Sequence, residues 1–422
     1  MKKYVILFLL IATMVTLYDA RKEKIRKDFT LFSLNASRVM YKGGNPYSEE
    51  EVGKKYKYFP LNAALLLPFT PLPDALAQGL WFALNACLFL YTFDLIQRMN
   101  GQKISPMVWL LILGLGARFI WENLKMGQWN APTLTLAVIG YYHLRKRPVG
   151  GALLLGLAAC LKFMPLVFIV LLTTRREWKS LALTFGFIFF WLLIVPSILL
   201  GPRRHVEVLE GYRQKLHTER VPDMLGGNAA KGFSLQAKLT SILSPVLTDD
   251  GDQYRTINIL NLPDKVARGL AWTLCGLLAL AAIVISIKSS GQGAGDDDFI
   301  RLGQAGMWMC MWLLASPEAR QPQFIWMFPG IFFLGALGFR RGCSGVQTYV
   351  GRAAIISGYV IVLTFSNILD KAVHLNRLTT AWGAQTLLAL IIFTGCAWSI
   401  WCMSSDQAKT AVEIKTPPAL TI

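Results

Sequence analysis

One acidic side chain stands alone in a basic stretch near the start of the chain. The segment RKDFTLFSLNASRVMYKGGNPY, residues 26–47, follows the first apolar run and holds one carboxylate, Asp28, among four basic residues. A carboxylate there could take a proton from an attacking hydroxyl group, a role worth roughly 10²–10⁴ in rate. It could instead be an exposed salt-bridge partner of Arg26 or Lys27, which contributes little. These residues alone favour the salt bridge.

Three basic residues lie inside or beside apolar runs, where a cation could hold a phosphate group. Lys162 follows the run GGALLLGLAACL, Arg118 lies near the outer end of another run, and Arg320 lies between two later runs. Such cations would stabilise the charge that develops on a departing phosphate. A lysine at membrane depth needs a water-filled cavity or an anion. The alternative for each is a side chain that extends to the interface, in the case of Lys162 from one long kinked helix.

A group of polar residues lies where one apolar run ends and the next begins. These side chains could bind sugar hydroxyls, or they could cap the two helices. They are Glu122, Asn123, Gln128 and Asn130. Asp28 is not part of an Asp-x-Asp pair and has no second acid close in sequence, so we predict no metal and no cofactor.

Composition places these residues in a membrane protein. Of the 422 residues, 54% are hydrophobic and only 16% are charged, whereas water-soluble domains have about a quarter charged. The net charge of +18 fits basic cytoplasmic loops and anionic headgroups. Without a basic and aromatic platform outside the apolar runs, nucleic acid is not an expected partner. The seven cysteines form no Cys-x-x-Cys pair, so neither a disulfide framework nor a zinc site is indicated.

Apolar runs with basic flanks predict an all-α polytopic fold with about 12 transmembrane helices and both termini cytoplasmic. Both flanks of residues 148–176 are basic, so we predict a hairpin of two short helices that turns at Lys162–Pro165. The proline-rich piece YFPLNAALLLPFTPLP is expected to be re-entrant or interfacial, or else a further span. The remaining predicted spans are 4–18, 76–97, 105–121, 129–144, 179–200, 267–287, 304–316, 324–339, 348–366 and 381–403.

Long polar segments divide the chain into predicted modules. Outer loops are expected between spans one and two and between spans seven and eight. The cytoplasmic tail from residue 404 is expected to lack regular structure. The modules are a catalytic transmembrane module over 1–200 that includes the outer loop 19–75, a large outer loop over 201–266, a C-terminal transmembrane module over 267–403, and the tail 404–422.

Ordered short motifs resemble glycosyltransferase family 87, the polyprenyl-phosphomannose-dependent mannosyltransferases of the GT-C class. The family's acid–aromatic pair, Gly-x-x-x-Tyr-like element, Tyr-Pro-Pro-like start, Gly-Gln-x-Asn element, Lys-x-x-Pro segment and Asn-…-Ser-Leu element occur in order over the first 240 residues. They fall on Asp28-Phe29, Gly43–Tyr47, Tyr58–Pro60, ENLKMGQWNAPTL, Lys162–Pro165 and GNAAKGFSL. Arg320 stands where a later Ser-Pro element usually has an aromatic residue or a histidine.

The resemblance implies a GT-C fold and a polyprenyl-phosphate sugar as the donor, with mannose as the expected sugar. Asp28 becomes the expected general base, and Lys162, Arg118 and Arg320 the expected phosphate ligands. The acceptor is expected to be a lipid or cell-envelope glycan at the outer face of a bacterial inner or plasma membrane, with membrane lipids around the spans. The expected sugar or acceptor ligands are Asn45, Tyr47, Glu122, Asn123, Gln128, Asn130, Asn228 and Ser234.

Two other functions remain open at this point. A transporter or lipid flippase would use Lys162 and Arg118 along a substrate path, but the internal repeats typical of transporters are not visible. A non-catalytic assembly subunit of an envelope complex would tolerate the change of Asp28 to asparagine.

Overall fold

The structure is a computed structural model that describes residues 28–48, 52, 56–217, 229–230, 232–249, 254–290, 298–317, 319–364, 380 and 382–415. The first predicted span, 4–18, lies outside these residues. The chain forms two compact units, and each takes in several separate segments. Unit 1 is Met1–Leu95, Arg118–Leu166 and Trp178–Gly227, and unit 2 is Ile96–Ala117, Val167–Glu177 and Asn228–Ile422. The consecutive modules expected from the sequence stay a prediction.

Unit 1 is built from helices of very different length. Its short helices are η1 (Phe29–Leu34), α2 (Asn35–Tyr41), α4 (Pro60–Leu65), η2 (Leu67–Phe69), η3 (Met164–Leu166), η4 (Phe190–Ile194) and α11 (Val195–Leu200). Its longer ones are α7 (Asn130–His143), α8 (Pro148–Leu161), α10 (Trp178–Phe189) and α12 (Pro202–Lys215), with the first part of α5 (Asp74–Asn100) and the last part of α6 (Pro106–Met126).

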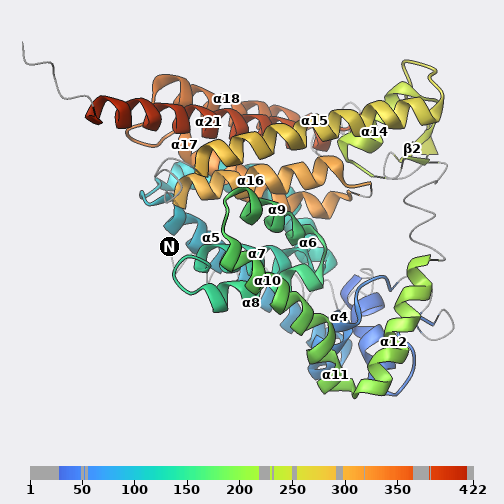
Figure 1. Cartoon of the computed structure of the whole chain (residues 1–422). Coiled ribbons are helices and arrows are strands. Elements are labelled where there is room, and N and C mark those ends of the chain that lie inside the picture. The colour runs from blue at the N-terminus through green and yellow to red at the C-terminus, as the bar shows by residue number, and fades with distance from the viewer. Residues whose placement is uncertain are drawn as a thin grey trace, which may run out of the picture. The chain divides into compact units, whose positions relative to one another are not determined.

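Helix α8 packs against both α7 and α10 (Figure 1). The approach to α7 is close because glycines face each other there. A Cβ atom on Gly140 would come within 2.7 Å of the Leu155 nitrogen, and one on Gly151 within 2.6 Å of the Leu144 nitrogen. Small residues at such crossings let two backbones touch, so α7 and α8 form the tight centre of unit 1.

Unit 2 is a bundle of long helices in which α15, α16 and α21 lie side by side, with α18 against α21 (Figure 1). Its strands are two or three residues long, with β1 parallel to β2 and β2 antiparallel to β3. The elements are α9 (Val167–Thr174), β1 (Ala229–Ala230), α14 (Leu235–Leu243), β2 (Leu247–Asp249), β3 (Tyr254–Arg255), α15 (Asp264–Ser290), α16 (Asp298–Ala315), η7 (Gln321–Met327), α17 (Phe328–Leu337), α18 (Gly345–Thr364) and α21 (Ala384–Lys415). The rest of α5 and α6 completes it.

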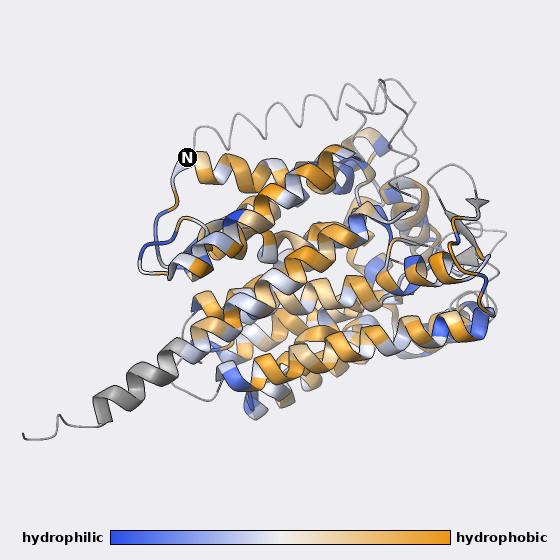
Figure 2. Ribbon diagram, turned by 90° about the horizontal axis from the view of Figure 1, so that it is seen from above, coloured by the Kyte–Doolittle hydropathy of each residue, from blue (hydrophilic) through white to orange (hydrophobic). Residues whose placement is uncertain are grey.

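Six helical stretches within the described ranges are long and apolar enough to cross a membrane. They are Asp74–Asn100, Pro106–Met126, Trp178–Leu200, Asp264–Ser290, Gly345–Thr364 and Ala384–Ser405. Apolar residues run along these helices, and hydrophilic residues gather toward their ends and in the connections (Figure 2). Each stretch coincides with a predicted span, whereas the total of about 12 spans stays a prediction.

One expectation about local structure is wrong, and two agree with the structure in part. Helix α8 ends at Leu161 and Lys162 is extended (φ −153°, ψ 147°), so the chain breaks where the turn was expected, whereas the hairpin itself stays a prediction. The proline-rich piece forms only α4 and η2, too short to cross a bilayer, and its re-entrant or interfacial position stays a prediction. The tail is helical as far as Lys415, because residues 404–415 contain good helix formers and no glycine or proline before Pro417.

A mostly buried ion pair ties the turn that follows α9 to α16 inside unit 2. Arg301 Nη1 lies 2.5 Å from Glu177 Oε1 with only 2% of the arginine side chain exposed, and Arg175 Nε lies 2.8 Å from the same oxygen. Arg175 also donates to Gln304, and Gln304 donates to Ser289 of α15. Burial raises the pKa of the Glu177 carboxyl, but the charges and hydrogen bonds of Arg301 and Arg175 outweigh burial, so the pKa ends below its ordinary value.

We therefore expect Glu177→Gln to lower the apparent melting temperature of the detergent-solubilised chain. Removing one partner leaves Arg301 charged and buried, a change that costs about 3–5 kcal/mol for fully buried pairs and about 2 kcal/mol or more for this partly exposed glutamate. Because the folded-state pKa is lowered, this stabilisation is present above the ordinary carboxyl pKa of about 4.3 and is lost as pH falls through the folded-state value. The fall in melting temperature on acidification should therefore be smaller in Glu177→Gln than in the wild type.

Glu207→Gln is the matched control, since Glu207 is 61% exposed and pairs with Arg203, which is 98% exposed. Thermal unfolding at pH 7 and at pH values below about 4 should show no change for this control. Equal melting temperatures for Glu177→Gln and wild type at pH 7 would contradict the role of the buried pair.

Candidate active site

Four of the residues singled out from the sequence form one hydrogen-bonded series in unit 1. Gln128 Nε2 donates to Asp28 Oδ2 at 2.6 Å, and Asn130 Nδ2 donates to Gln128 Oε1 at 2.8 Å. Lys162 Nζ donates to Asn130 Oδ1. Asp28 and Lys162, which lie 134 positions apart in the chain, are thus linked through two side-chain amides.

The direction of this series follows from its two ends. An ammonium group only donates hydrogen bonds and a carboxylate only accepts them, whereas an amide does both. Each amide therefore turns its oxygen toward Lys162 and its nitrogen toward Asp28. Asn130 is fully buried and the other three side chains are partly buried. Partial burial strengthens such charge-assisted bonds, so the series orients a carboxylate and an ammonium within one small region.

A glycine turn brings Gln128 to Asp28. Gly127 directly follows α6 and has φ +65°, a conformation that favours glycine, and a Cβ atom there would come within 2.8 Å of the Phe29 Cβ atom. Trp81 Nε1 donates to the Gly127 carbonyl oxygen at 2.8 Å, and the Trp81 ring stacks on Phe29 with centroids 5.0 Å apart. The residue next to Asp28 and the residue next to Gln128 are therefore held by one tryptophan.

Several aromatic side chains pack around the residues that carry the polar series. The Trp129 ring meets Trp81 edge to face at 4.7 Å, and Phe69 meets Phe29 edge to face at 6.1 Å. The Lys162 ammonium group lies 6.0 Å from the centroid of the Tyr58 ring. Trp129 Nε1 is buried without a hydrogen-bond partner among the described residues. Trp81 had no signal in the sequence, because nothing marks one tryptophan in an apolar run as a support for Gly127.

The polar residues at the end of α6 have local partners. Arg118 Nε lies 3.5 Å from Glu122 Oε1, one helical turn away, and each side chain is about a quarter exposed. Asn123 is fully buried and donates to the Phe119 carbonyl oxygen at 2.9 Å. Their predicted roles in phosphate and sugar binding stay predictions.

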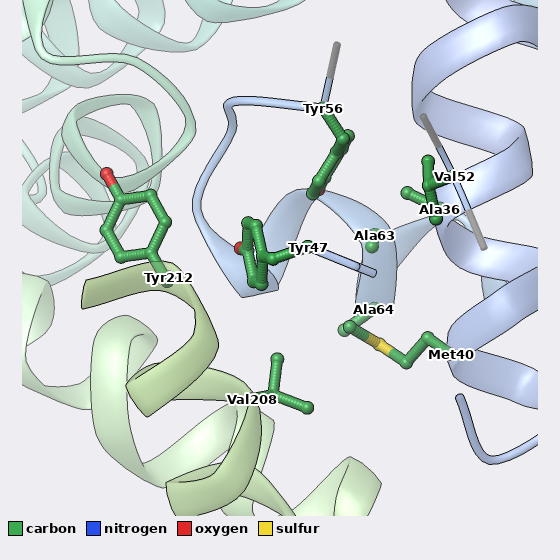
Figure 3. Close-up of a cluster of buried hydrophobic side chains, with 9 residues drawn as sticks. All are labelled: Ala36, Met40, Tyr47, Val52, Tyr56, Ala63, Ala64, Val208 and Tyr212. Atoms are coloured by element: carbon green, nitrogen blue, oxygen red, sulfur yellow. The ribbon is translucent and has the colours of Figure 1, made fainter. Parts of the chain in front are cut away.

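Tyr47 belongs to a packed cluster between the first loop and α12, which we call the tyrosine cluster: Ala36, Met40, Tyr47, Val52, Tyr56, Ala63, Ala64, Val208 and Tyr212 (Figure 3). The Tyr47 hydroxyl donates to the Tyr58 carbonyl oxygen at 2.7 Å, and its backbone N–H donates to Asn45 Oδ1 at 3.0 Å. Burial raises the pKa of the Tyr47 hydroxyl well above its usual value, and Tyr56 and Tyr212 raise it further. Through these contacts Asn45 and Tyr47 support the structure of the loop, and their predicted role in ligand binding stays a prediction.

The remaining predicted ligands belong to unit 2 or lie outside the described ranges. Ser234 is fully buried and caps α14 by accepting a hydrogen bond from the Ala237 N–H at 3.1 Å. Arg320 is exposed at the start of η7, where its backbone N–H donates to Gln323. Asn228 lies outside the described residues. The structure gives Ser234 a capping function, and ligand binding by these residues stays a prediction.

Comparison with known proteins decides the family. Residues 56–317 match glycosyltransferase family 87. The chain belongs to this family. A polyprenol-phosphate-mannose-dependent alpha-(1-2)-phosphatidylinositol mannoside mannosyltransferase of Mycobacterium tuberculosis is 23% identical over 338 residues, 75% of this chain and 71% of the relative. An alpha-(1->3)-arabinofuranosyltransferase of Corynebacterium glutamicum is 29% identical over 167 residues, 38% of this chain and 39% of the relative.

Membership of family 87 makes the chain a membrane glycosyltransferase of the GT-C type, as the motifs indicated, and it sets aside the transporter and the non-catalytic subunit. The matched segment includes Gln128, Asn130 and Lys162, and Asp28 precedes it. Three members of the hydrogen-bonded series are thus in the part of the chain shared with the family.

Replacing Gln128 with leucine should lower the transferase activity by about 10- to 100-fold, because the change removes the donor to Asp28 and the acceptor for Asn130 together. Initial rates of sugar transfer in detergent or lipid nanodiscs measure the effect. Gln78→Leu is the control, since Gln78 Nε2 bonds Thr30, two residues from Asp28, at 3.1 Å. A similar loss in both variants, or none in Gln128→Leu, would contradict the importance of the series.

Proposed function

We propose that this family 87 enzyme transfers a sugar from a polyprenyl-phosphate donor to a lipid or cell-envelope glycan at the outer face of a bacterial plasma membrane. The proposed sugar is mannose. The hydrogen-bonded series from Asp28 to Lys162 supports this proposal, because it holds a carboxylate that can accept a proton and an ammonium group that can bind a phosphate in one region. The Mycobacterium tuberculosis relative, by its name, uses polyprenol-phosphate-mannose and acts on a phosphatidylinositol mannoside, which supports the donor and the acceptor class.

Asp28 is the proposed general base. Its carboxylate would accept the proton from the acceptor hydroxyl as the hydroxyl oxygen attacks the anomeric carbon of the donor sugar. Gln128 holds one carboxylate oxygen through a 2.6 Å hydrogen bond, which orients the carboxyl group for the attacking hydroxyl. Positioning of this kind converts a weak base into an effective one.

Lys162 is the proposed ligand of the departing phosphate. As the new bond to the acceptor oxygen forms, the bond from the anomeric carbon to the phosphate oxygen breaks, and the negative charge on the polyprenyl phosphate increases. An ammonium group fixed by Asn130 can stabilise that charge without reorganising during the reaction. Arg118 and Arg320 are proposed as further phosphate ligands, and Glu122, Asn123, Gln128 and Asn130 as ligands of sugar or acceptor hydroxyls.

The identity of the transferred sugar is the most detailed claim of the proposal. The shorter match to an arabinofuranosyltransferase favours a polyprenyl-phosphate pentose as the second candidate donor. Assays of the purified chain with each lipid-linked sugar and a bacterial lipid extract separate the two. Transfer from the arabinose donor alone would replace mannose and leave the rest of the mechanism unchanged.

Changing Asp28 to asparagine should reduce transfer by roughly 10²–10⁴-fold. The amide keeps an oxygen that can accept the hydrogen bond from Gln128, so the geometry is retained while the base is lost. The measurement is the initial rate with saturating donor and acceptor, alongside the melting temperature. Asp74→Asn is the control, because Asp74 is an exposed partner of Arg38 at 2.6 Å. Wild-type rates in Asp28→Asn would remove Asp28 as the base.

A single base and a preformed leaving group predict one displacement, and therefore inversion at the anomeric carbon. Nuclear magnetic resonance of the product made from a donor of known anomeric configuration measures this outcome. The product should have the opposite anomeric configuration from the donor. Retention would require a covalent intermediate or a second displacement and would contradict the proposed mechanism.

A further inference from the structure

The end of α8 leaves a carbonyl group that the helix cannot satisfy. In an α-helix, each carbonyl oxygen accepts from the N–H four residues later. The Leu161 carbonyl would need the N–H of residue 165, which is a proline and has none. The last hydrogen bond of α8 runs from the Lys162 N–H to the Ala158 carbonyl oxygen at 3.1 Å.

Asn62 supplies the missing donor from a distant part of unit 1. Its Nδ2 atom donates to the Leu161 carbonyl oxygen at 3.1 Å, across 99 positions of sequence. The side chain is fully buried on α4, and its Oδ1 atom has no hydrogen-bond partner among the described residues. The buried Asn62 amide therefore bonds the residue immediately before Lys162.

This contact bears directly on where Lys162 points. Lys162 leaves the helix in an extended conformation, and its ammonium group reaches Asn130. A helix end whose last carbonyl is unsatisfied can unwind or shift to find a partner. Such a shift at Leu161 would move the Lys162 Cα atom and therefore the ammonium group, because the two residues are adjacent.

We propose that Asn62 is a positioning residue that fixes the end of α8 and thereby aims Lys162 at the donor phosphate. The inference rests on the proposed function of Lys162 as the phosphate ligand. Asn62 acts through the peptide of Leu161 and needs no contact with substrate. Because the Gly127 turn holds Asp28 and Gln128 at the other end of the series, loss of Asn62 should affect binding of the donor more than binding of the acceptor.

The test is a double-mutant cycle on the full chain in lipid nanodiscs, with polyprenyl-phosphate-mannose as the donor probe and a bacterial lipid extract as acceptor. Asn62→Leu should raise the donor KM by about 10-fold and leave the acceptor KM within about 2-fold, as expected for a shift of one donor ligand. Lys162→Met should raise the donor KM by at least as much. The double variant should be no worse than Lys162→Met alone, because residues that act through one group are not additive.

Asn85→Leu is the matched control. Asn85 is also buried, donates to a backbone carbonyl (Trp81, at 2.7 Å) and has an Oδ1 atom without a partner among the described residues, but its bond stays within α5. Its effect on the donor KM should be small and additive with Lys162→Met. If Asn62→Leu does not fold, Asn62→Ser, which keeps a hydroxyl donor, enters the same cycle and should show an intermediate rise in donor KM.

The outcomes separate this inference from the proposed function. An additive cycle between Asn62 and Lys162, or equal effects of Asn62→Leu on donor and acceptor KM, would overturn the positioning role while leaving Lys162 as a phosphate ligand. A Lys162→Met variant with unchanged donor KM and unchanged kcat would instead overturn the proposed function of Lys162, and with it the basis of the positioning role.

Discussion

The candidate active site depends on one constraint: a carboxylate and an ammonium group are joined through two neutral amides. Because Lys162 can only donate and Asp28 can only accept, the side chains of Asn130 and Gln128 have one favourable orientation between them. A direct ion pair would tend to bring the two charges together. The series instead links them through amides, so that each can meet a different part of a reacting sugar phosphate.

The packing of unit 1 holds the two ends of this series by separate means. At one end, Trp81 bonds the Gly127 turn and stacks on Phe29, next to Asp28. At the other end, α8 stops at Leu161, where Asn62 bonds the final carbonyl. Both supports are buried and tightly packed, which suits a site whose groups must be oriented before substrate arrives.

Much of the fold was predictable because a helix in lipid must satisfy its own backbone and so appears as a long apolar run. The break at Lys162 was predictable from basic flanks and Pro165. The small β1–β3 sheet and the helical tail were missed, since short strands carry little pattern and the tail is polar. Asp28, Gln128 and Lys162 were found through motifs, whereas Asn62 and Trp81 were missed because their contacts join residues 99 and 46 positions apart.

The most direct test of these roles is an experimental structure of the full chain in lipid with a non-hydrolysable phosphonate analogue of the polyprenyl-phosphate sugar. If Lys162 and Asp28 act as proposed, a phosphonate oxygen lies within hydrogen-bond distance of Lys162 Nζ, about 3 Å, and the anomeric carbon lies on the side open to the Asp28 carboxylate. A phosphonate bound away from Lys162, with the anomeric carbon remote from Asp28, would contradict these roles.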